Sequence, residues 1–454
     1  MYGLGSVIRD MSTIDPWDPW HVISLANAWQ AGDFGVVSVP FDPMHTNAVV
    51  EEYLRLGLAF DRLEPGFVDA FTGDPALRRE VENAAAPDPR ELARQAATLR
   101  AEVGGAGLTP QRAQFLTSAL HALECSARKF AGDEITFVDE VRNYFDVDIE
   151  MGDPELYRQA HLDLDALLPG GGDLADRYAA HRRSEEIPAD KIADAVSAFS
   201  SALRDKVRGT YTLPETEVVD FEVVTDKPWS GFNYYLGDYR SRVAINGDLT
   251  QYMSSLPHLI AHEAYPGHHT EHCRKEQILV GGGQIEQTIF LVNTPQCLMA
   301  EGLADHALVA AVGPDWGTWA QEIYADLGLR FDGRRAEAIG KATGGLLGVR
   351  QDAALLLHDR GADHDTVAAY LRQWLLATDE RARQMLRFLS SPLWRAYIST
   401  YVEGYRLLQT WLEAGVAQGA GSSVPAGDHL ARFGRLLDEP LTPAALRAEL
   451  ALQS

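Results

Sequence analysis

Cysteine is scarce in this chain. Only three of its 454 residues are cysteines, Cys125, Cys273 and Cys297, and they are widely spaced and odd in number. The count excludes a disulfide framework, and the spacing excludes a Cys-x-x-Cys metal cluster. We expect the three thiols to act as small buried apolar side chains.

Basic residues and long apolar runs are also in short supply. Lys and Arg total 40 against 65 Asp and Glu, a formal net charge of −25. Such a chain repels phosphate backbones and anionic lipid, so we expect neither nucleic acid nor membrane as a partner. No segment approaches the roughly 20 consecutive apolar residues of a membrane helix. Residues 1–20 contain Asp10, Asp15 and Asp18 and lack the apolar core of a signal peptide. We therefore expect a cytoplasmic protein, whose oligomeric state the sequence leaves open.

Most of the sequence is typical of helices. Three helix starts are marked by a capping side chain directly before a proline, at Thr109-Pro110, Asp153-Pro154 and Thr442-Pro443. A proline in the first helical turn costs nothing, because its missing N–H would have no partner inside the helix. These signals predict a mostly α fold.

Residues 218–246 differ from the rest of the chain. Valine and aromatic residues concentrate there, as in Val218-Val219, in Phe221 and in the run that begins at Phe232. We predict a small sheet of about three strands. It lies immediately before a histidine-rich helix, where a sheet edge could bind an extended substrate.

That histidine-rich segment begins with His262-Glu263. In the usual zincin arrangement a second histidine follows four residues after the first, and the intervening glutamate acts as general base. Position 266 is proline instead, and the next histidines are His268 and His269. In a regular helix His268 would lie about 120° away from His262, and His269 about 10 Å along the axis. Pro266-Gly267 supplies a cause for distortion, and a bulge there would place His268 where the fourth-residue histidine normally stands.

A rival pattern lies inside the same segment. His268, Glu271 and His272 satisfy the inverted motif H-x-x-E-H, which needs no distortion. His258 also stands four residues before His262, although a packed histidine is the better interpretation there.

The sequence Glu301-Gly-Leu-Ala-Asp305 follows 38 residues after Glu263. Glutamate zincins take their third ligand from a second helix, and an aspartate one turn later can orient a ligand histidine. The apolar neighbours Leu298, Met299 and Leu303 make this pair more specific than two solvated acids.

Together these segments resemble the DUF885 family of bacterial proteins, which is grouped with the glutamate zincins. His262-Glu-Ala-Tyr-Pro-Gly-His-His269 is similar to its H-E-x-x-P-G-H-H signature, and Glu301-Gly-Leu-Ala304 to its E-G-W-A element. Arg350, Asp352 and His358 loosely match a later helical region, and Tyr401-Val-Glu-Gly404 resembles its Y-x-x-G element. The family's tryptophan and tyrosine after E-G are replaced by Leu303 and His306, and a later acid by Leu308.

The resemblance implies a mostly helical, two-lobed fold with a central cleft. We expect a helical N-terminal lobe over residues 1–210 and a catalytic lobe over 211–454. The resemblance favours His262, His268 and Glu301 as ligands of one Zn²⁺ per chain, with Glu263 as base. The choice between His268 and His269 stays open, and Asp305 is the orienting partner.

These observations predict a zinc-dependent hydrolase, and within that class a metallopeptidase acting on a peptide or small amide. Tyr401, Tyr405 and His358 are candidate donors to the developing oxyanion. Arg350 is a candidate for binding a substrate carboxylate, and Tyr405 for contacting the substrate. The alternatives are a zinc hydrolase of non-peptide amides or esters, and a metal-binding protein without catalysis.

Overall fold

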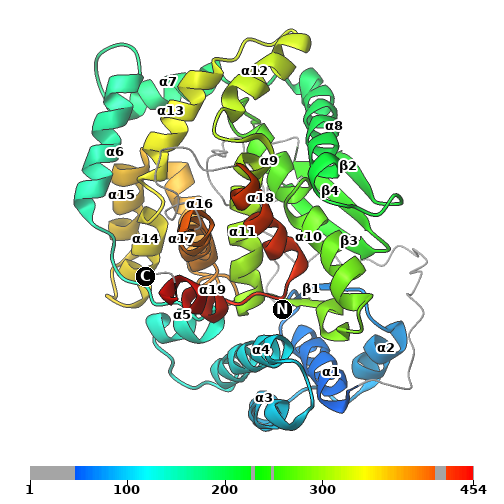
Figure 1. Cartoon of the computed structure of the whole chain (residues 1–454). Coiled ribbons are helices and arrows are strands. Elements are labelled where there is room, and N and C mark those ends of the chain that lie inside the picture. The colour runs from blue at the N-terminus through cyan, green and yellow to red at the C-terminus, as the bar shows by residue number, and fades with distance from the viewer. Residues whose placement is uncertain (1–46, 226–230, 247–249, 415–425, 453–454) are drawn as a thin grey trace.

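The computed structural model describes residues 47–225, 231–246, 250–414 and 426–452. The expectation about residues 1–20 lies outside these ranges. Within them, no helix is long and apolar enough to cross a membrane. The described chain is mostly α-helical with two small sheets, which confirms the predicted fold class (Figure 1).

The first part of the chain is helical apart from one short strand. The predicted caps at Thr109 and Asp153 are present, because each side chain accepts a hydrogen bond from a backbone N–H of the helix it precedes. The elements are α1 (Ala48–Leu63), β1 (Val68–Phe71), α2 (Pro75–Asn83), α3 (Pro89–Glu102), η3 (Val103–Gly105), α4 (Pro110–Phe130), α5 (Phe137–Phe145), α6 (Pro154–Leu167), α7 (Leu174–Ser184), η4 (Ala189–Lys191) and α8 (Ile192–Thr210).

The predicted sheet is confirmed by three strands, β2 (Val218–Val224), β3 (Gly231–Gly237) and β4 (Arg240–Asn246). β4 is central, parallel to β2 and antiparallel to β3. β3 is therefore an edge strand, and it contacts both helices of the histidine-rich segment. A second sheet, which the sequence did not predict, pairs β1 antiparallel with β5 (Ile289–Leu291).

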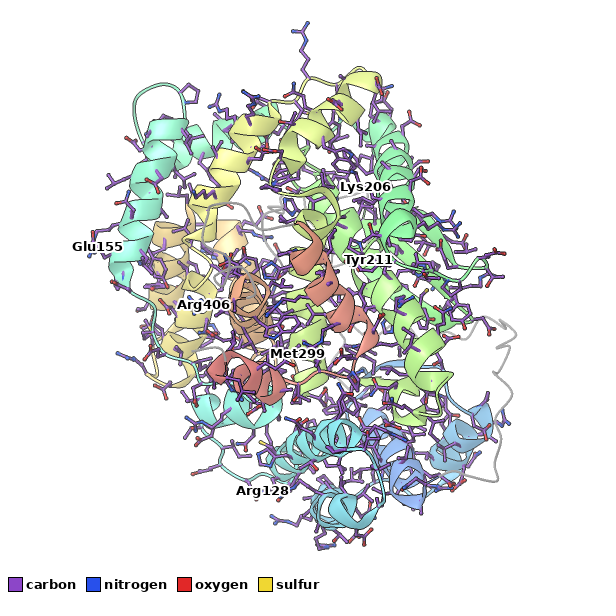
Figure 2. All side chains as sticks on the ribbon, in the orientation of Figure 1. Arg128, Glu155, Lys206, Tyr211, Met299 and Arg406 are labelled. Carbon is purple, nitrogen blue, oxygen red and sulfur yellow. The ribbon has the colours of Figure 1, made fainter. Side chains whose placement is uncertain are left out.

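The histidine-rich segment forms α9 (Leu256–Glu263) and α10 (His268–Lys275), followed by η5 (Glu276–Val280) and η6 (Ile285–Thr288). Beside them runs α11 (Pro295–Val312), in the middle of the molecule (Figure 1). This helix is buried on nearly every face, as its apolar composition requires. Figure 2 shows Met299 of α11 among the central helices, while Glu155 of α6 lies at the outer edge.

The remaining helices follow α11 in the chain, and several of them contact it. Thr442 caps the last of them, as predicted. They are α12 (Trp316–Asp326), α13 (Gly333–Gly344), α14 (Val349–His358), α15 (His364–Leu375), α16 (Asp379–Leu389), η7 (Thr400–Gly404), α17 (Tyr405–Ala414), α18 (Ala426–Asp438) and α19 (Pro443–Ala451).

One hydrophobic core reaches from Val50 of α1 to Leu446 of α19. The predicted lobe boundary at residue 210 coincides with the end of α8, and the division into two lobes stays a prediction. The three cysteines are buried and free, as expected from their number and spacing.

Candidate metal centre

The segment between α9 and α10 brings two histidines together. α9 ends at Glu263 and α10 begins at His268, so the distortion expected at Pro266-Gly267 is present. The Gly267 N–H donates to the carbonyl of Ala261, six residues earlier. A Cβ on Gly267 would lie 1.9 Å from the carbonyl oxygen of His262, so only glycine allows this return of the chain. As a result, the Nε2 atoms of His262 and His268 are 3.2 Å apart.

Glu301 of α11 completes a three-residue group. Its Oε2 lies 3.3 Å from Nε2 of His262, and its Oε1 lies 3.7 Å from Nε2 of His268. One ligand atom from each residue lies within 4.8 Å of the others, and all three side chains are buried. Tetrahedral zinc with ligands at about 2.0–2.1 Å separates those ligands by about 3.3 Å. The donor set and its spacing therefore fit a zinc ion.

Neighbouring side chains contact and orient these three residues. Asp305, one turn after Glu301, lies 3.1 Å from Nδ1 of His262, so Nε2 points toward the other ligands. Burial lowers the pKa of His262, but Asp305 and Glu301 outweigh burial and raise that pKa well above its usual value. Tyr397 donates a hydrogen bond of 2.7 Å to Oε1 of Glu301. Such partners fix the geometry of metal ligands.

Glu263 places its carboxylate beside this group, while its backbone carbonyl accepts a hydrogen bond from Asn233. Its side chain is buried, and neither carboxylate oxygen has a hydrogen-bond partner among the described residues. Burial raises its pKa to about 7, with Glu301 and Asp69 contributing, while His262 and His268 oppose the rise. The edge strand β3 runs directly beside it, because a Cβ on Gly231 would lie 3.4 Å from Oε1 of Glu263 and 2.8 Å from the side chain of Leu259. A carboxylate with this pKa can exchange protons near neutral pH.

The two glycines of the later motifs meet each other. A Cβ on Gly302 would lie 2.7 Å from the carbonyl carbon and oxygen of Gly404, and one on Gly404 would lie 2.6 Å from the carbonyl of Leu298. α11 and η7 therefore approach backbone to backbone. This contact brings the buried Tyr401 near His262, His268 and Glu301, which together are called the metal group below. There, burial and then the charge of Glu301 raise the pKa of Tyr401. A tyrosine with a raised pKa keeps its proton and remains a donor.

The remaining candidates, Arg350 and Tyr405 for the substrate and His358 for catalysis, lie in two different places. Arg350 and Tyr405 line a cavity of about 580 Å³ whose wall also includes His262 and Asp305. The ring of Tyr405 stacks on His306, and its carbonyl oxygen accepts a hydrogen bond from that histidine. His358 lies elsewhere: its Nε2 bonds the carbonyl of Leu389 and its ring packs against Phe137. The structure does not bring His358 to the metal group.

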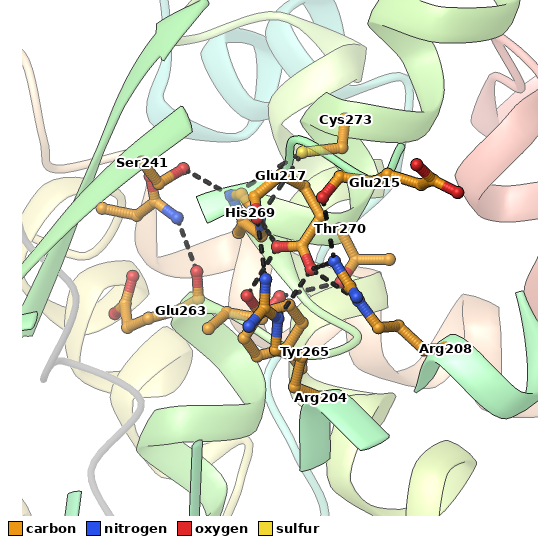
Figure 3. A network of polar contacts seen from close by, with 12 residues as sticks. Arg204, Arg208, Glu215, Glu217, Ser241, Glu263, Tyr265, His269, Thr270 and Cys273 are labelled. Atoms are coloured by element: carbon orange, nitrogen blue, oxygen red, sulfur yellow. Dashed lines mark hydrogen bonds and ion pairs between the residues drawn. The ribbon is translucent and has the colours of Figure 1, made fainter. Parts of the chain in front are cut away.

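His269 faces away from the metal group into a separate polar network (Figure 3). Its Nδ1 lies 2.9 Å from Oγ of Ser241 and its Nε2 3.1 Å from Oε2 of Glu217. Glu217 also accepts hydrogen bonds from Tyr265 and Arg204. This geometry brings His268, and not His269, into the three-residue group.

The rival inverted motif is not assembled. His272 stacks on Tyr235 with ring centroids 4.5 Å apart, and burial lowers its pKa to about 3. Glu271 accepts a hydrogen bond from Lys275. His258 packs edge-on against Trp316, as expected for a histidine in the core.

Two residues near the group were missed by the sequence-based reasoning, Tyr397 and Asp69. Asp69 is an exposed residue of β1. It lies within electrostatic range of both His268 and Glu301. Neither residue belongs to a recognisable motif, and both come from elements far from the histidines in sequence.

Neither a protein-family model nor a curated protein matches this sequence. Among solved structures, the chain is similar to a putative lipoprotein from Colwellia psychrerythraea, with 13% identity, a TM-score of 0.47 and coverage of 83% of this chain and 69% of that one. It is also similar to a putative lipoprotein of unknown function from Shewanella oneidensis, with 13% identity, a TM-score of 0.43 and coverage of 83% and 76%. At these scores neither likeness carries an argument about fold or function.

Proposed function

We propose that this protein is a zinc-dependent hydrolase, and within that class a metallopeptidase. One observation carries the proposal: His262, His268 and Glu301 converge within 4.8 Å, and the buried carboxylate of Glu263 beside them has no hydrogen-bond partner among the described residues. A purely structural metal site has no use for such a carboxylate. One ion per chain follows from the single group of this kind found in the described part of the chain.

Zinc held by three protein ligands would lower the pKa of water to about 7 and polarise a carbonyl group. The residues of the chain then have separate tasks. Glu263 accepts a proton from the attacking water as the oxygen of that water bonds to the carbonyl carbon. It passes this proton to the leaving nitrogen as the carbon–nitrogen bond breaks. Tyr401 donates a hydrogen bond to the oxyanion, and Asp305 and Tyr397 keep His262 and Glu301 in position.

The resemblance in sequence leads to a further part of the proposal, membership of the DUF885 family. The contact between Gly302 and Gly404 supports it, because the close approach of the two backbones explains why both the E-G and the Y-x-x-G elements contain a glycine. We also propose a cytoplasmic location, since three buried free thiols suit a reducing compartment. Cell fractionation with an antibody against the chain would test the location.

Metal content measured by elemental mass spectrometry is the first test. Wild type and His272→Ala are expected to hold one zinc per chain, while His262→Ala and Glu301→Ala hold none. A chelator should lower the melting temperature of the first two only, since ligand binding at 1,000 times Kd contributes about 4 kcal/mol. Loss of zinc in His272→Ala with retention in His262→Ala would move the centre to the inverted motif.

Activity is tested with a peptide library and a panel of small esters and amides. Wild type should cleave peptides, and Glu263→Gln should keep its zinc and lose cleavage. Cleavage of esters alone would exclude the peptidase and leave a hydrolase of other acyl compounds. No bound metal after zinc reconstitution would overturn the hydrolase proposal altogether.

A further inference from the structure

A cavity of about 580 Å³ reaches one side of the proposed metal centre, at His262 and Asp305, while His268, Glu301 and Glu263 do not line it. Its wall includes the ligand His262 and its partner Asp305, and it extends to residues of α7, α14, α16 and α17. Much of this wall is apolar, with leucines from α6, α9, α15 and α17. An apolar cavity with a few converging polar groups is the usual form of a small-ligand or substrate site.

Three buried arginines from three different helices line this cavity. They are Arg182 of α7, Arg350 of α14 and Arg381 of α16, with 6%, 8% and 5% of their surface exposed. Arginine is almost never buried to this degree, and its guanidinium cannot lose its proton. Each of the three also has interactions inside the protein, such as the Arg182 guanidinium 3.8 Å from the ring centroid of Tyr252. Five N–H donors allow one guanidinium to hold an internal partner and a ligand together.

The charge of the cavity differs from that of the chain. The described residues that line it include four arginines against three carboxylates, namely Glu186, Asp305 and Glu413, whereas the whole chain has 40 basic and 65 acidic residues. Asp305 already pairs with His262. Burial lowers the pKa of the lining histidines His258 and His306 to about 3 and 4, so both are neutral at pH 7. The wall is therefore suited to a negatively charged group.

We propose that this cavity binds the carboxylate of the substrate through Arg182, Arg350 and Arg381, so that the enzyme acts on peptides that carry a carboxylate close to the scissile bond. The inference rests on the proposed peptidase function and names its substrate class. The carboxylate comes from the C-terminus or from an acidic side chain, and both present the planar pair of oxygens that a guanidinium binds bidentately.

Binding without turnover tests the proposal separately from catalysis. Three fluorescent peptides of one apolar sequence are titrated into zinc-loaded Glu263→Gln protein: one with a free C-terminal carboxylate, one with a C-terminal amide, and one amide with a glutamate side chain. At least one of the two carboxylate peptides is expected to bind roughly tenfold or more tightly than the plain amide. The tighter of the two identifies the source of the carboxylate.

The same titration is repeated in Arg350→Gln and Arg381→Gln, each combined with Glu263→Gln. Both should lose the preference for a carboxylate, whereas Arg387→Gln, an exposed position on the same helix as Arg381, should keep it. Arg350→Lys retains the charge without the planar fork and should show a reduced preference, which covers the case in which Arg350→Gln does not fold.

Equal binding of all three peptides, or a preference that survives both glutamine variants, would overturn this proposal while leaving the peptidase intact. An arginine-dependent preference in a protein that cleaves none of the peptides would overturn the peptidase and retain the carboxylate site.

Discussion

His268 and His269 are neighbours in the sequence and belong to two different polar clusters. The metal group around His268 contains a carboxylate, Glu263, whose two oxygens have no hydrogen-bond partner among the described residues. In the network around His269, both ring nitrogens and the Glu217 carboxylate are paired. Both clusters are buried and combine histidine with glutamate, so burial and composition do not distinguish them.

What distinguishes them is whether the hydrogen bonding is complete. A buried network that satisfies its own members stabilises one conformation, while a buried carboxylate left without partners costs free energy unless something else binds there. Ser241, His269 and Glu217 even have the residue types of a hydrolytic triad. All three are 0% exposed, so no substrate reaches the Ser241 hydroxyl. The complete cluster supports the fold, and the incomplete cluster is the better candidate for chemistry.

The largest expected effect is a loss of catalytic activity when the metal group is changed and the network around His269 is left intact. Glu263→Gln should reduce kcat on a cleaved peptide by about 10²–10⁴-fold, the usual contribution of a positioned general base. Its melting temperature should stay the same or rise, because the change removes a buried charge that lacks a partner. A fall in melting temperature with unchanged kcat would assign Glu263 to the fold instead.

Glu217→Gln should act in the opposite way, on stability. This change weakens the side-chain acceptor that Arg204 and Arg208 share; the Glu217 carboxylate is buried but both arginine side chains are more than a third exposed, so we expect a loss of about 1–3 kcal/mol. Urea unfolding would measure the loss. Glu215→Gln, an exposed glutamate two residues earlier, is the matched control and should change the free energy of unfolding by less than about 0.5 kcal/mol.

Gly302→Ala should lower both stability and zinc affinity. The added methyl group would collide with the backbone of Gly404, at a cost of about 1–3 kcal/mol, and the shift of α11 should weaken zinc affinity. Gly209→Ala in α8 is the control, because nothing lies within 4 Å of its Cβ position. Equal zinc affinity in both variants would show that the glycine contact does not position Glu301.

A fall in pH should gradually reduce the stability contributed by the network of Glu217 and His269. Burial alone would raise the pKa of Glu217, but hydrogen bonds from His269, Tyr265 and Arg204 outweigh it and hold the pKa at about 2. Because this lies below the usual value of 4.5, the stabilisation is present above pH 4.5 and is lost as pH falls toward 2. The free energy of unfolding between pH 5 and pH 3 should therefore fall less in Glu217→Gln than in wild type.

The sequence predicted the parts that depend on local pattern. The mostly α fold, the capped starts at Thr109, Asp153 and Thr442, and the sheet over 218–246 follow from spacing and residue type. The distortion at Pro266-Gly267 was also predictable, because proline removes a helical hydrogen bond and glycine admits the close approach of His262.

The sequence could not reveal partners that only the tertiary fold brings together. Tyr397 reaches Glu301 across 96 residues and Glu217 reaches His269 across 52, without any motif that links them. Asp69 arrives on a strand whose pairing with β5 was not predicted. His358 shows the reverse error, because its loose motif match placed it in a site that the structure does not bring it to.

The network around His269 also limits how this centre could be transplanted into another scaffold. A designer who copied only the helical motif and Glu301 would leave behind Glu217, which directly precedes β2, and Ser241, which lies in β4. These two residues hold His269. Without them the ring of His269 would be free to compete with His268 for zinc, since one peptide unit joins the two residues. The smallest portable unit is therefore α9 and α10, the part of α11 that holds Glu301 and Asp305, and the sheet that contacts α9 and α10.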